Sequence, residues 1–314
     1  MITEKVKKQA FAALGCDPDQ AELLGGYNGN VFGINRGGEE IVVKILENAV
    51  INVEALLSEL EWLEYLRSKG LSAVKPLRLE AGKFIHPVSE EYCCVAYEKA
   101  PGIPLNPNDI MSWNPNVFEQ WGKVMGKMHA LAKSYDPVHI RPQWFQHNLL
   151  QDEFLHKDPL IAEKWRQYRA AFKQLSVTRD EYGLIHGDLH HSNVLLHQGN
   201  LTLLDFGDSE YHWYAYDIAI SVYHTAYAVP AGPQRDAFLQ VFFNSFMNGY
   251  AQENSHIGFI SQIDAFIDYR HLFSYTYHTA YADLSQLKQG QMEFLGQMRS
   301  AILNGSCCLG FALV

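Results

Sequence analysis

Polar residues in the middle of the chain have the types and the spacing that phosphoryl transfer requires. They lie between residues 185 and 210, as His186, Asp188, Asn193 and Asp205. A phosphoryl group that moves between two oxygens must be held in line with its acceptor while divalent cations neutralise its charge. The Asp188 carboxylate can accept a hydroxyl proton and orient the attacking oxygen. Asn193 and Asp205 carry the hard oxygen ligands that magnesium prefers.

The elements around these residues must bring them together. The sequence predicts a short strand over 194–196, a turn at Gln198-Gly199-Asn200 and a returning strand over 201–204, which delivers Asp205 beside Asn193. A hairpin that carries these residues without binding a metal is the structural alternative. It requires several polar positions to coincide by chance between apolar strands. Asp208 follows as a possible second acidic group.

These motifs resemble a known signature. His186-x-Asp188-x-x-x-x-Asn193 followed by Asp205-Phe-Gly is similar to the eukaryotic-like kinase motif. The His-Gly-Asp variant is typical of the aminoglycoside phosphotransferase and choline kinase superfamily. The continuation to Asp217 most resembles the branch that holds type II homoserine kinases and stress-response kinases.

The resemblance implies an α+β, two-lobed, protein-kinase-like fold, with ATP and Mg²⁺ as cofactors. Residues 1–98 are then a nucleotide-binding lobe made of an antiparallel sheet and a helix. Residues 99–314 are a larger, mainly helical lobe for catalysis and substrate binding. The whole chain is long enough to form two lobes that each have a hydrophobic core, because it has 314 residues and 47% hydrophobic content.

A glycine-rich stretch near the amino terminus fits a loop over a triphosphate. Gly25, Gly26 and Gly29 lie between apolar flanks, with Asn28 among them. Only glycine lets backbone amides approach phosphate so closely. We therefore place Gly26, Asn28 and Gly29 in the cofactor site, although an ordinary hairpin would have the same composition.

A lysine and an acidic helix follow this stretch. Lys44 interrupts the β-branched run Ile41-Val-Val-Lys-Ile, which resembles the kinase strand whose lysine holds the α- and β-phosphates. Apolar residues at helical spacing predict a helix over about 53–68. Its glutamates are Glu54, Glu59, Glu61 and Glu64. Alignment of the segment from Trp62 to Leu71 on the resembling family favours Glu59 as the partner of Lys44. The ordinary explanation of charges on a helix is that they form a solvated face.

The strand over 92–98 breaks at Pro101-Gly102. In the resembling family this position is the hinge whose backbone groups bind adenine. We therefore place Tyr97, Glu98 and Ala100 in the cofactor site, as a location and not as side-chain roles. An ordinary strand exit fits the composition equally well.

Several histidines near these motifs have simpler explanations than catalysis. His129 falls on the apolar face of a helix predicted over 117–133, where a hydrogen-bonded core residue is the usual outcome. His190, His191 and His197 lack the spacing of a zinc site. Asp217 could cap a helix over 217–227 or brace the catalytic loop.

The carboxy-terminal part is predicted to be helical and is rich in aromatic residues. A helix over 235–250 has the composition of core. A helix over 266–281 carries polar-tipped aromatics and Arg270. We place Arg270, Tyr277 and His212 in the substrate pocket, together with Asp208, although core packing is the default for aromatic stripes.

Composition narrows the classes of partner. The net charge of −10 and the lack of a lysine- or arginine-rich run argue against a nucleic-acid partner. No apolar stretch approaches the about twenty residues of a membrane span, and the first residues do not form a signal peptide, so we expect no membrane partner and a cytoplasmic location. The cysteine spacing favours neither disulfides nor zinc. The oligomeric state is not readable.

The predicted activity is transfer of the ATP γ-phosphoryl group to a hydroxyl of a small molecule such as an amino alcohol, a homoserine-like compound or an aminoglycoside. One alternative is a Ser/Thr protein kinase of the stress-response type. The short connection from Asp205 to Asp217, without an Ala-Pro-Glu element, favours small substrates over proteins. Another alternative is a nucleotide-binding relative without catalysis. The acceptor is not readable from the sequence, nor is a preference for ATP over GTP.

Overall fold

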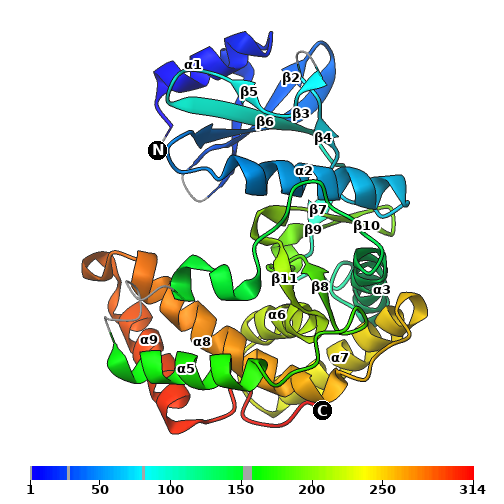
Figure 1. Cartoon of the computed structure of the whole chain (residues 1–314), viewed down its shortest axis with the longest axis vertical. Helices are drawn as coiled ribbons and strands as arrows, with labels where there is room; N and C mark the ends of the chain where they lie inside the picture. The colour runs from blue at the N-terminus through cyan, green and yellow to red at the C-terminus, as the bar shows by residue number, and fades with distance from the viewer. Residues whose placement is uncertain (1, 27–28, 80–81, 151–157) are drawn as a thin grey trace. The chain divides into compact units, whose positions relative to one another are not determined.

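The computed structural model describes residues 2–26, 29–79, 82–150 and 158–314. The chain forms two compact units (Figure 1). The first contains Met1–Ile103, Asp136–Ile140 and Leu195–Gly207, and the second contains Pro104–Tyr135, Arg141–Val194 and Asp208–Val314. Within the described residues, no helix is both long enough and apolar enough to cross a bilayer.

The first unit is built on a six-stranded antiparallel sheet of order β1-β2-β3-β6-β4, with β5 also paired to β6. The strands are β1 (Glu22–Gly25), β2 (Val31–Arg36), β3 (Glu39–Glu47), β4 (Pro76–Leu77), β5 (His86–Pro87) and β6 (Tyr92–Glu98). The same unit contains the helices α1 (Glu4–Ala13) and α2 (Val53–Ser68). Phe11 of α1 packs edge-on against Phe32 of β2 in the core of this unit.

Two short segments from later in the chain belong to the first unit. Strand β10 (Asn200–Leu203) is tied to the segment before β4, since the Leu203 amide donates to the Ser72 carbonyl and the Leu203 carbonyl accepts from the Val74 amide. His139 contacts Glu61 of α2 at 2.7 Å. Because hydrogen bonds of this kind tie them to the first unit, the compact units do not follow a single division between residues 98 and 99.

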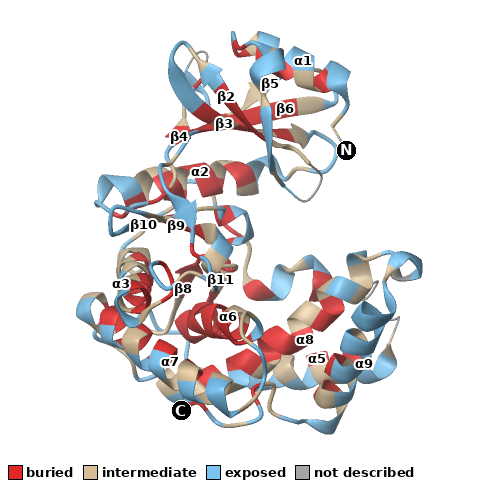
Figure 2. Cartoon of the chain, turned by 180° about the vertical axis from the view of Figure 1, so that it is seen from behind, coloured by how far each residue is buried: buried red, intermediate tan, exposed pale blue. Residues whose placement is uncertain are grey.

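The second unit is mainly helical. Its helices are α3 (Pro115–Ala132), α5 (Pro159–Phe172), α6 (Tyr214–Tyr227), α7 (Pro233–Glu253), α8 (Ile263–Tyr281) and α9 (Gln289–Asn304). Helix α6 is buried along nearly its whole length, as Figure 2 shows, and it packs against both α7 and α8. A helix that is buried on nearly every side must be enclosed by other elements, so α6 forms the centre of this core.

Glycines allow α3 and α7 to pack very closely. A Cβ on Gly122 of α3 would lie 1.8 Å from the Phe246 carbonyl oxygen. A Cβ on Gly249 of α7 would lie 1.8 Å from the Glu119 carbonyl oxygen. These helix backbones therefore touch directly, and no larger residue fits at either glycine.

Two small sheets complete the fold. Strands β8 (Tyr182–Ile185) and β11 (Glu210–Trp213) pair antiparallel, with Glu210 opposite Ile185. A three-stranded sheet has the order β10-β9-β7, where β9 is Val194–His197 and β7 is Ile103–Pro104. The α+β class is confirmed, with an antiparallel sheet in the amino-terminal part and helices in the carboxy-terminal part.

Candidate active site

The loop between β8 and β9 carries Asp188 and Asn193 in the second unit. It continues directly from the buried strand β8 and ends in a short turn, η5 (His191–Asn193). Gly187 has a φ of +84°, and a Cβ there would lie 2.2 Å from the Asp208 carbonyl oxygen. Glycine is therefore required immediately before Asp188, since it adopts positive φ without strain and leaves room for the Asp208 backbone.

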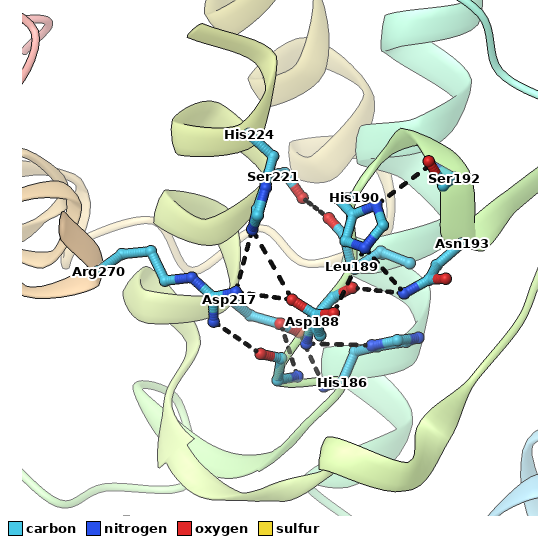
Figure 3. A network of polar contacts seen from close by, with 11 residues as sticks. His186, Asp188, Leu189, His190, Ser192, Asn193, Asp217, Ser221, His224 and Arg270 are labelled. Carbon is cyan, nitrogen blue, oxygen red and sulfur yellow. Dashed lines mark hydrogen bonds and ion pairs between the residues drawn. The ribbon is translucent and has the colours of Figure 1, made fainter. Parts of the chain in front are cut away.

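The Asp188 carboxylate has polar groups on three sides (Figure 3). Its Oδ1 accepts a hydrogen bond from Arg270 of α8 at 2.7 Å and lies 3.8 Å from His224 Nε2 of α6. Its Oδ2 lies 3.4 Å from His190 Nε2. The side chain is 25% exposed, so solvent and a ligand can still reach it.

This environment keeps Asp188 ionised. Burial alone would raise its pKa, but the contact with His190 and the positive charge of Arg270 hold the pKa well below its usual range. A carboxylate of this kind stays charged throughout the neutral pH range. It is therefore suited to orient a hydroxyl and to receive its proton late in a reaction.

Asp217 of α6 fixes the backbone of this loop. Its carboxylate is completely buried and accepts hydrogen bonds from the backbone amides of His186 (2.9 Å) and Gly187 (3.0 Å). Burial raises the pKa of Asp217, but the contacts with His129 and His186 outweigh it, so its pKa lies below the ordinary value. The sequence left two roles for Asp217, a helix cap or a brace for the catalytic loop, and these contacts show that it braces the loop. No side chain caps the start of α6.

A chain of buried hydrogen bonds continues from Asp217 across the second unit. His129 Nε2 contacts Asp217 at 3.0 Å, and His129 Nδ1 contacts the Tyr250 hydroxyl at 2.9 Å. Asn254 donates to the Tyr250 oxygen and accepts from Lys133. Burial lowers the pKa of His129, so a neutral ring connects Asp217 to Tyr250. His129 is thus the hydrogen-bonded core residue that the sequence predicts.

Asn193 is oriented by Asp188. Its amide nitrogen donates to the Asp188 carbonyl oxygen at 2.9 Å. Its amide oxygen accepts no hydrogen bond from the residues that the structure describes. The nitrogen is therefore used to fix the side chain, and the oxygen is left to bind a further group.

In the first unit, Lys44, Glu59 and Asp205 converge on one point. The Lys44 Nζ and Asp205 Oδ1 atoms are 3.7 Å apart. Lys44 Nζ, Glu59 Oε2 and Asp205 Oδ1 all lie within 4 Å of where a Cβ on Gly207 would be. Asp205 has a φ of +55° and a side chain that is 61% exposed. This conformation is uncommon outside glycine and turns the carboxylate outward from the end of β10.

The remaining cofactor residues all belong to the first unit. Gly26 and Gly29 lie at positive φ between β1 and β2, as a tight glycine turn requires, whereas Asn28 lies outside the described residues. The Tyr97 hydroxyl donates to Glu59 Oε1 at 3.2 Å. The amides of Glu98 and Lys99 donate to the Lys75 and Glu40 carbonyls. The Ala100 amide donates to no described residue, so, unlike the amides of Glu98 and Lys99, it is open to a ligand.

The four residues predicted for the substrate pocket have different surroundings. Arg270 directly contacts Asp188. Asp208 is exposed, and Tyr277 stacks on Phe273 further along α8. The structure corrects the expectation that His212 lines the substrate pocket. This residue has no exposed surface and lies among aromatic rings, including those of Trp144 and Tyr216. Because alternate residues of β11 face inward, this histidine is part of the core and does not line an open pocket.

Sequence reasoning missed Glu210. Its side chain is buried on β11, and burial together with the nearby Asp208 raises its pKa to about 8. The alternation within Glu210-Tyr-His-Trp is the signal that could have shown it, because Glu210 shares a face with His212.

The chain is similar along nearly its whole length to known kinases. Amicoumacin kinase of Bacillus subtilis (strain 168) is 30% identical over 319 residues, covering 98% of this chain and 94% of that protein. A structure of amicoumacin kinase in complex with AMP-PNP, Ca²⁺ and Ami superposes with a TM-score of 0.88 at 26% identity, covering 99% of each chain. A microcompartment-associated aminopropanol kinase has a TM-score of 0.75 at 16% identity over 99% of this chain and 100% of its own, which shows a shared fold.

The reaction class follows from these similarities. Similarity to small-molecule kinases along nearly the whole chain confirms the predicted phosphotransferase activity toward a small-molecule hydroxyl, and it does not favour the protein-kinase alternative. The kinase-like fold is confirmed by the same structures. A family model described as the phosphotransferase enzyme family matches residues 19–253, so the chain belongs to this family.

Proposed function

We propose that this enzyme transfers the γ-phosphoryl group of ATP to a hydroxyl of amicoumacin or of a closely similar compound, with Mg²⁺ as the metal. The similarity to amicoumacin kinases supports the acceptor. The complex of one of them with AMP-PNP, an analogue of ATP, and with Ca²⁺ supports ATP and a divalent cation. Mg²⁺ is the finer part of the proposal, based on the oxygen ligands of Asn193 and Asp205.

The donor set of the chain fits a magnesium ion. The Asn193 amide oxygen accepts no hydrogen bond from a described residue, and the Asp205 carboxylate is exposed. No cluster of three or more His, Cys, Asp or Glu side chains that could hold a metal occurs in the described part of the chain. A magnesium ion that keeps phosphate oxygens as ligands needs only one or two protein oxygens of the Asn193 and Asp205 kind. When bound, the ion neutralises charge on the phosphates.

The remaining roles follow from charge and position. Lys44, supported by Glu59, binds phosphate oxygens, and the amides around Gly26 and Gly29 approach the phosphates. The backbone from Tyr97 to Ala100 contacts the base. On this proposal residues 1–98 are the nucleotide-binding lobe, to whose compact unit residues 195–207 also belong, and residues 99–314 carry the acceptor site with Asp188. Because ATP is the phosphoryl donor, we propose a cytoplasmic location, with no nucleic-acid or membrane partner.

The environment of Asp188 is the observation that carries the proposal. Its carboxylate is ionised and partly open to solvent, and the same loop orients Asn193. An acceptor hydroxyl that donates to Asp188 would be activated and aligned by one group. A fold that had lost catalysis would not need this charged, oriented side chain.

The test is a steady-state assay of ATP consumption with amicoumacin as the first acceptor, followed by a panel of amino alcohols and aminoglycosides. We expect Asp188→Asn to abolish transfer and to leave ATP binding intact, and Asp205→Asn to weaken binding of Mg²⁺-ATP. Asp283→Asn is the matched control, since Asp283 is exposed and its carboxylate accepts hydrogen bonds from Ser285. Full activity in Asp188→Asn would refute the assigned chemistry, and ATP binding without transfer to any acceptor would support the non-catalytic alternative.

A further inference from the structure

Arg270 reaches the catalytic loop from a distant part of the chain. Its Nη2 donates to Asp188 Oδ1 at 2.7 Å, and its Nη1 lies 3.4 Å from the Gly187 carbonyl oxygen. The side chain is only 9% exposed. A guanidinium in such a position binds a carboxylate with fixed geometry, because its donors lie in one plane and it stays charged.

His224 of α6 fixes the other side of the guanidinium. Arg270 Nη2 also donates to His224 Nε2 at 3.0 Å, so this ring nitrogen must carry a lone pair. Burial and the neighbouring Arg270 charge hold the pKa of His224 well below its usual range, which is consistent with a neutral ring. His224 is therefore a hydrogen-bond acceptor that directs Arg270 toward Asp188.

The guanidinium is enclosed by groups from several elements. The Phe273 ring of α8 lies 5.1 Å from the Arg270 Cζ atom. Tyr216 of α6 hydrogen-bonds to Arg270, and the buried Glu210 of β11 interacts with its charge. Since packing and polar contacts both restrict it, Arg270 has little freedom to turn away.

The other oxygen of Asp188 is approached from the loop itself. His190 Nδ1 accepts from the Ser192 amide at 3.2 Å, so the ring N–H is on Nε2, which lies 3.4 Å from Asp188 Oδ2. A carboxylate can accept about four hydrogen bonds, and two are used here. The plane of the group is therefore set, and lone pairs remain for an acceptor hydroxyl.

From this geometry we propose that Arg270, directed by His224, is a positioning residue that holds the Asp188 carboxylate in the orientation that receives the acceptor hydroxyl. The inference rests on the proposed role of Asp188. It differs from a substrate-binding role for Arg270, because the guanidinium acts through Asp188. Loss of Arg270 would let the carboxylate rotate about its broad terminal torsion.

Steady-state kinetics with ATP and amicoumacin test this role. We expect Arg270→Gln to lower kcat by roughly 10²-fold, the cost of a small misplacement of a reacting group, and to leave the KM for ATP unchanged. Arg270→Lys should recover part of the loss. His224→Gln, which presents a carbonyl oxygen, should retain more kcat than His224→Leu. Arg166→Gln, on the exposed surface of α5, is the matched control.

A spectroscopic measurement tests the same contact without any acceptor. In the wild-type chain the Arg270 side-chain protons should give a slowly exchanging, shifted signal in a ¹⁵N-edited NMR spectrum, since they are buried and bonded to a carboxylate. The signal should disappear in Arg270→Lys and move in Asp188→Ala. An unmoved signal in Asp188→Ala would overturn the inference.

The outcomes separate the two proposals. Loss of activity in Asp188→Asn with full kcat in Arg270→Gln would refute the positioning role and leave the proposed function standing. Full activity in Asp188→Asn would refute the proposed function itself. A rise confined to the KM for the acceptor in Arg270→Gln would show that Arg270 binds substrate, and would also overturn the inference.

Discussion

Replacement of Asp217 by asparagine should separate the catalytic loop from the core that supports it. The Asp217 carboxylate accepts hydrogen bonds from the His186 and Gly187 amides and from His129, and it has no exposed surface. A hydrogen bond to a charged group contributes about 1.5–3 kcal/mol. Asparagine keeps one acceptor oxygen and turns an NH₂ group toward a donor, so one or two of these bonds are lost.

We therefore expect Asp217→Asn to lower the free energy of unfolding by about 3–5 kcal/mol. The loop should also shift, and a displacement of about 1 Å at Asp188 would lower kcat by roughly 10²-fold. Because the pKa of Asp217 is lowered in the folded state, its contribution is present above the unfolded value of about 3.9 and is lost as the pH falls. The difference between variant and wild type should shrink in acid.

Urea denaturation followed by tryptophan fluorescence measures this loss, and the ATP assay measures kcat on the same samples. Asp180→Asn is the control, because Asp180 is an exposed residue paired with Lys133 and should change stability by less than about 1 kcal/mol. An Asp217→Asn variant within about 1 kcal/mol of wild type would show that Asp217 does not support the loop as described.

Other changes test the remaining features. Because burial raises the pKa of Glu210 from 4.5 to about 8, wild-type stability should fall by up to about 5 kcal/mol as the pH rises through that window, and denaturation of Glu210→Gln across pH should lack this dependence. Gly122→Ala should lower the Tm, since its Cβ would meet a carbonyl of α7 at 1.8 Å and such overpacking costs about 1–3 kcal/mol, whereas Gly296→Ala on the open face of α9 should gain about 0.5–1 kcal/mol. Lys44→Met should raise the KM for ATP by about tenfold or more, and Lys123→Met, which removes a surface ion pair with Glu253, should leave it unchanged.

The elements with strong local signals could be predicted from the sequence. Helix α2 was expected over about residues 53–68 and forms over Val53–Ser68, because Asn52 caps its start and its apolar residues recur at helical spacing. The hairpin that leads to Asp205 was also expected, within one residue at each end, since the turn at Gln198 and Gly199 separates two apolar runs. Local chemistry was sufficient in both places.

Contacts between distant residues could not be predicted in this way. Arg270 and Asp188 are 82 positions apart, and their contact depends on how α8 is rotated in the core. Strand β11 has only four residues, and its partner β8 precedes it by more than twenty positions, so no turn signal joined them. The alternation within these four residues was too short a signal by itself to reveal the buried positions of Glu210 and His212.

The buried hydrogen bonds that lead from Lys133 through Asn254, Tyr250 and His129 to Asp217 also limit how this enzyme can change. They connect the catalytic loop to helices α3, α6 and α7, so a mutation in the loop backbone disturbs the interior as well. Adaptation to a new acceptor would then proceed by replacing side chains that border Asp188 without belonging to this set of bonds. The enzyme would keep its chemistry constant while its selectivity diverged.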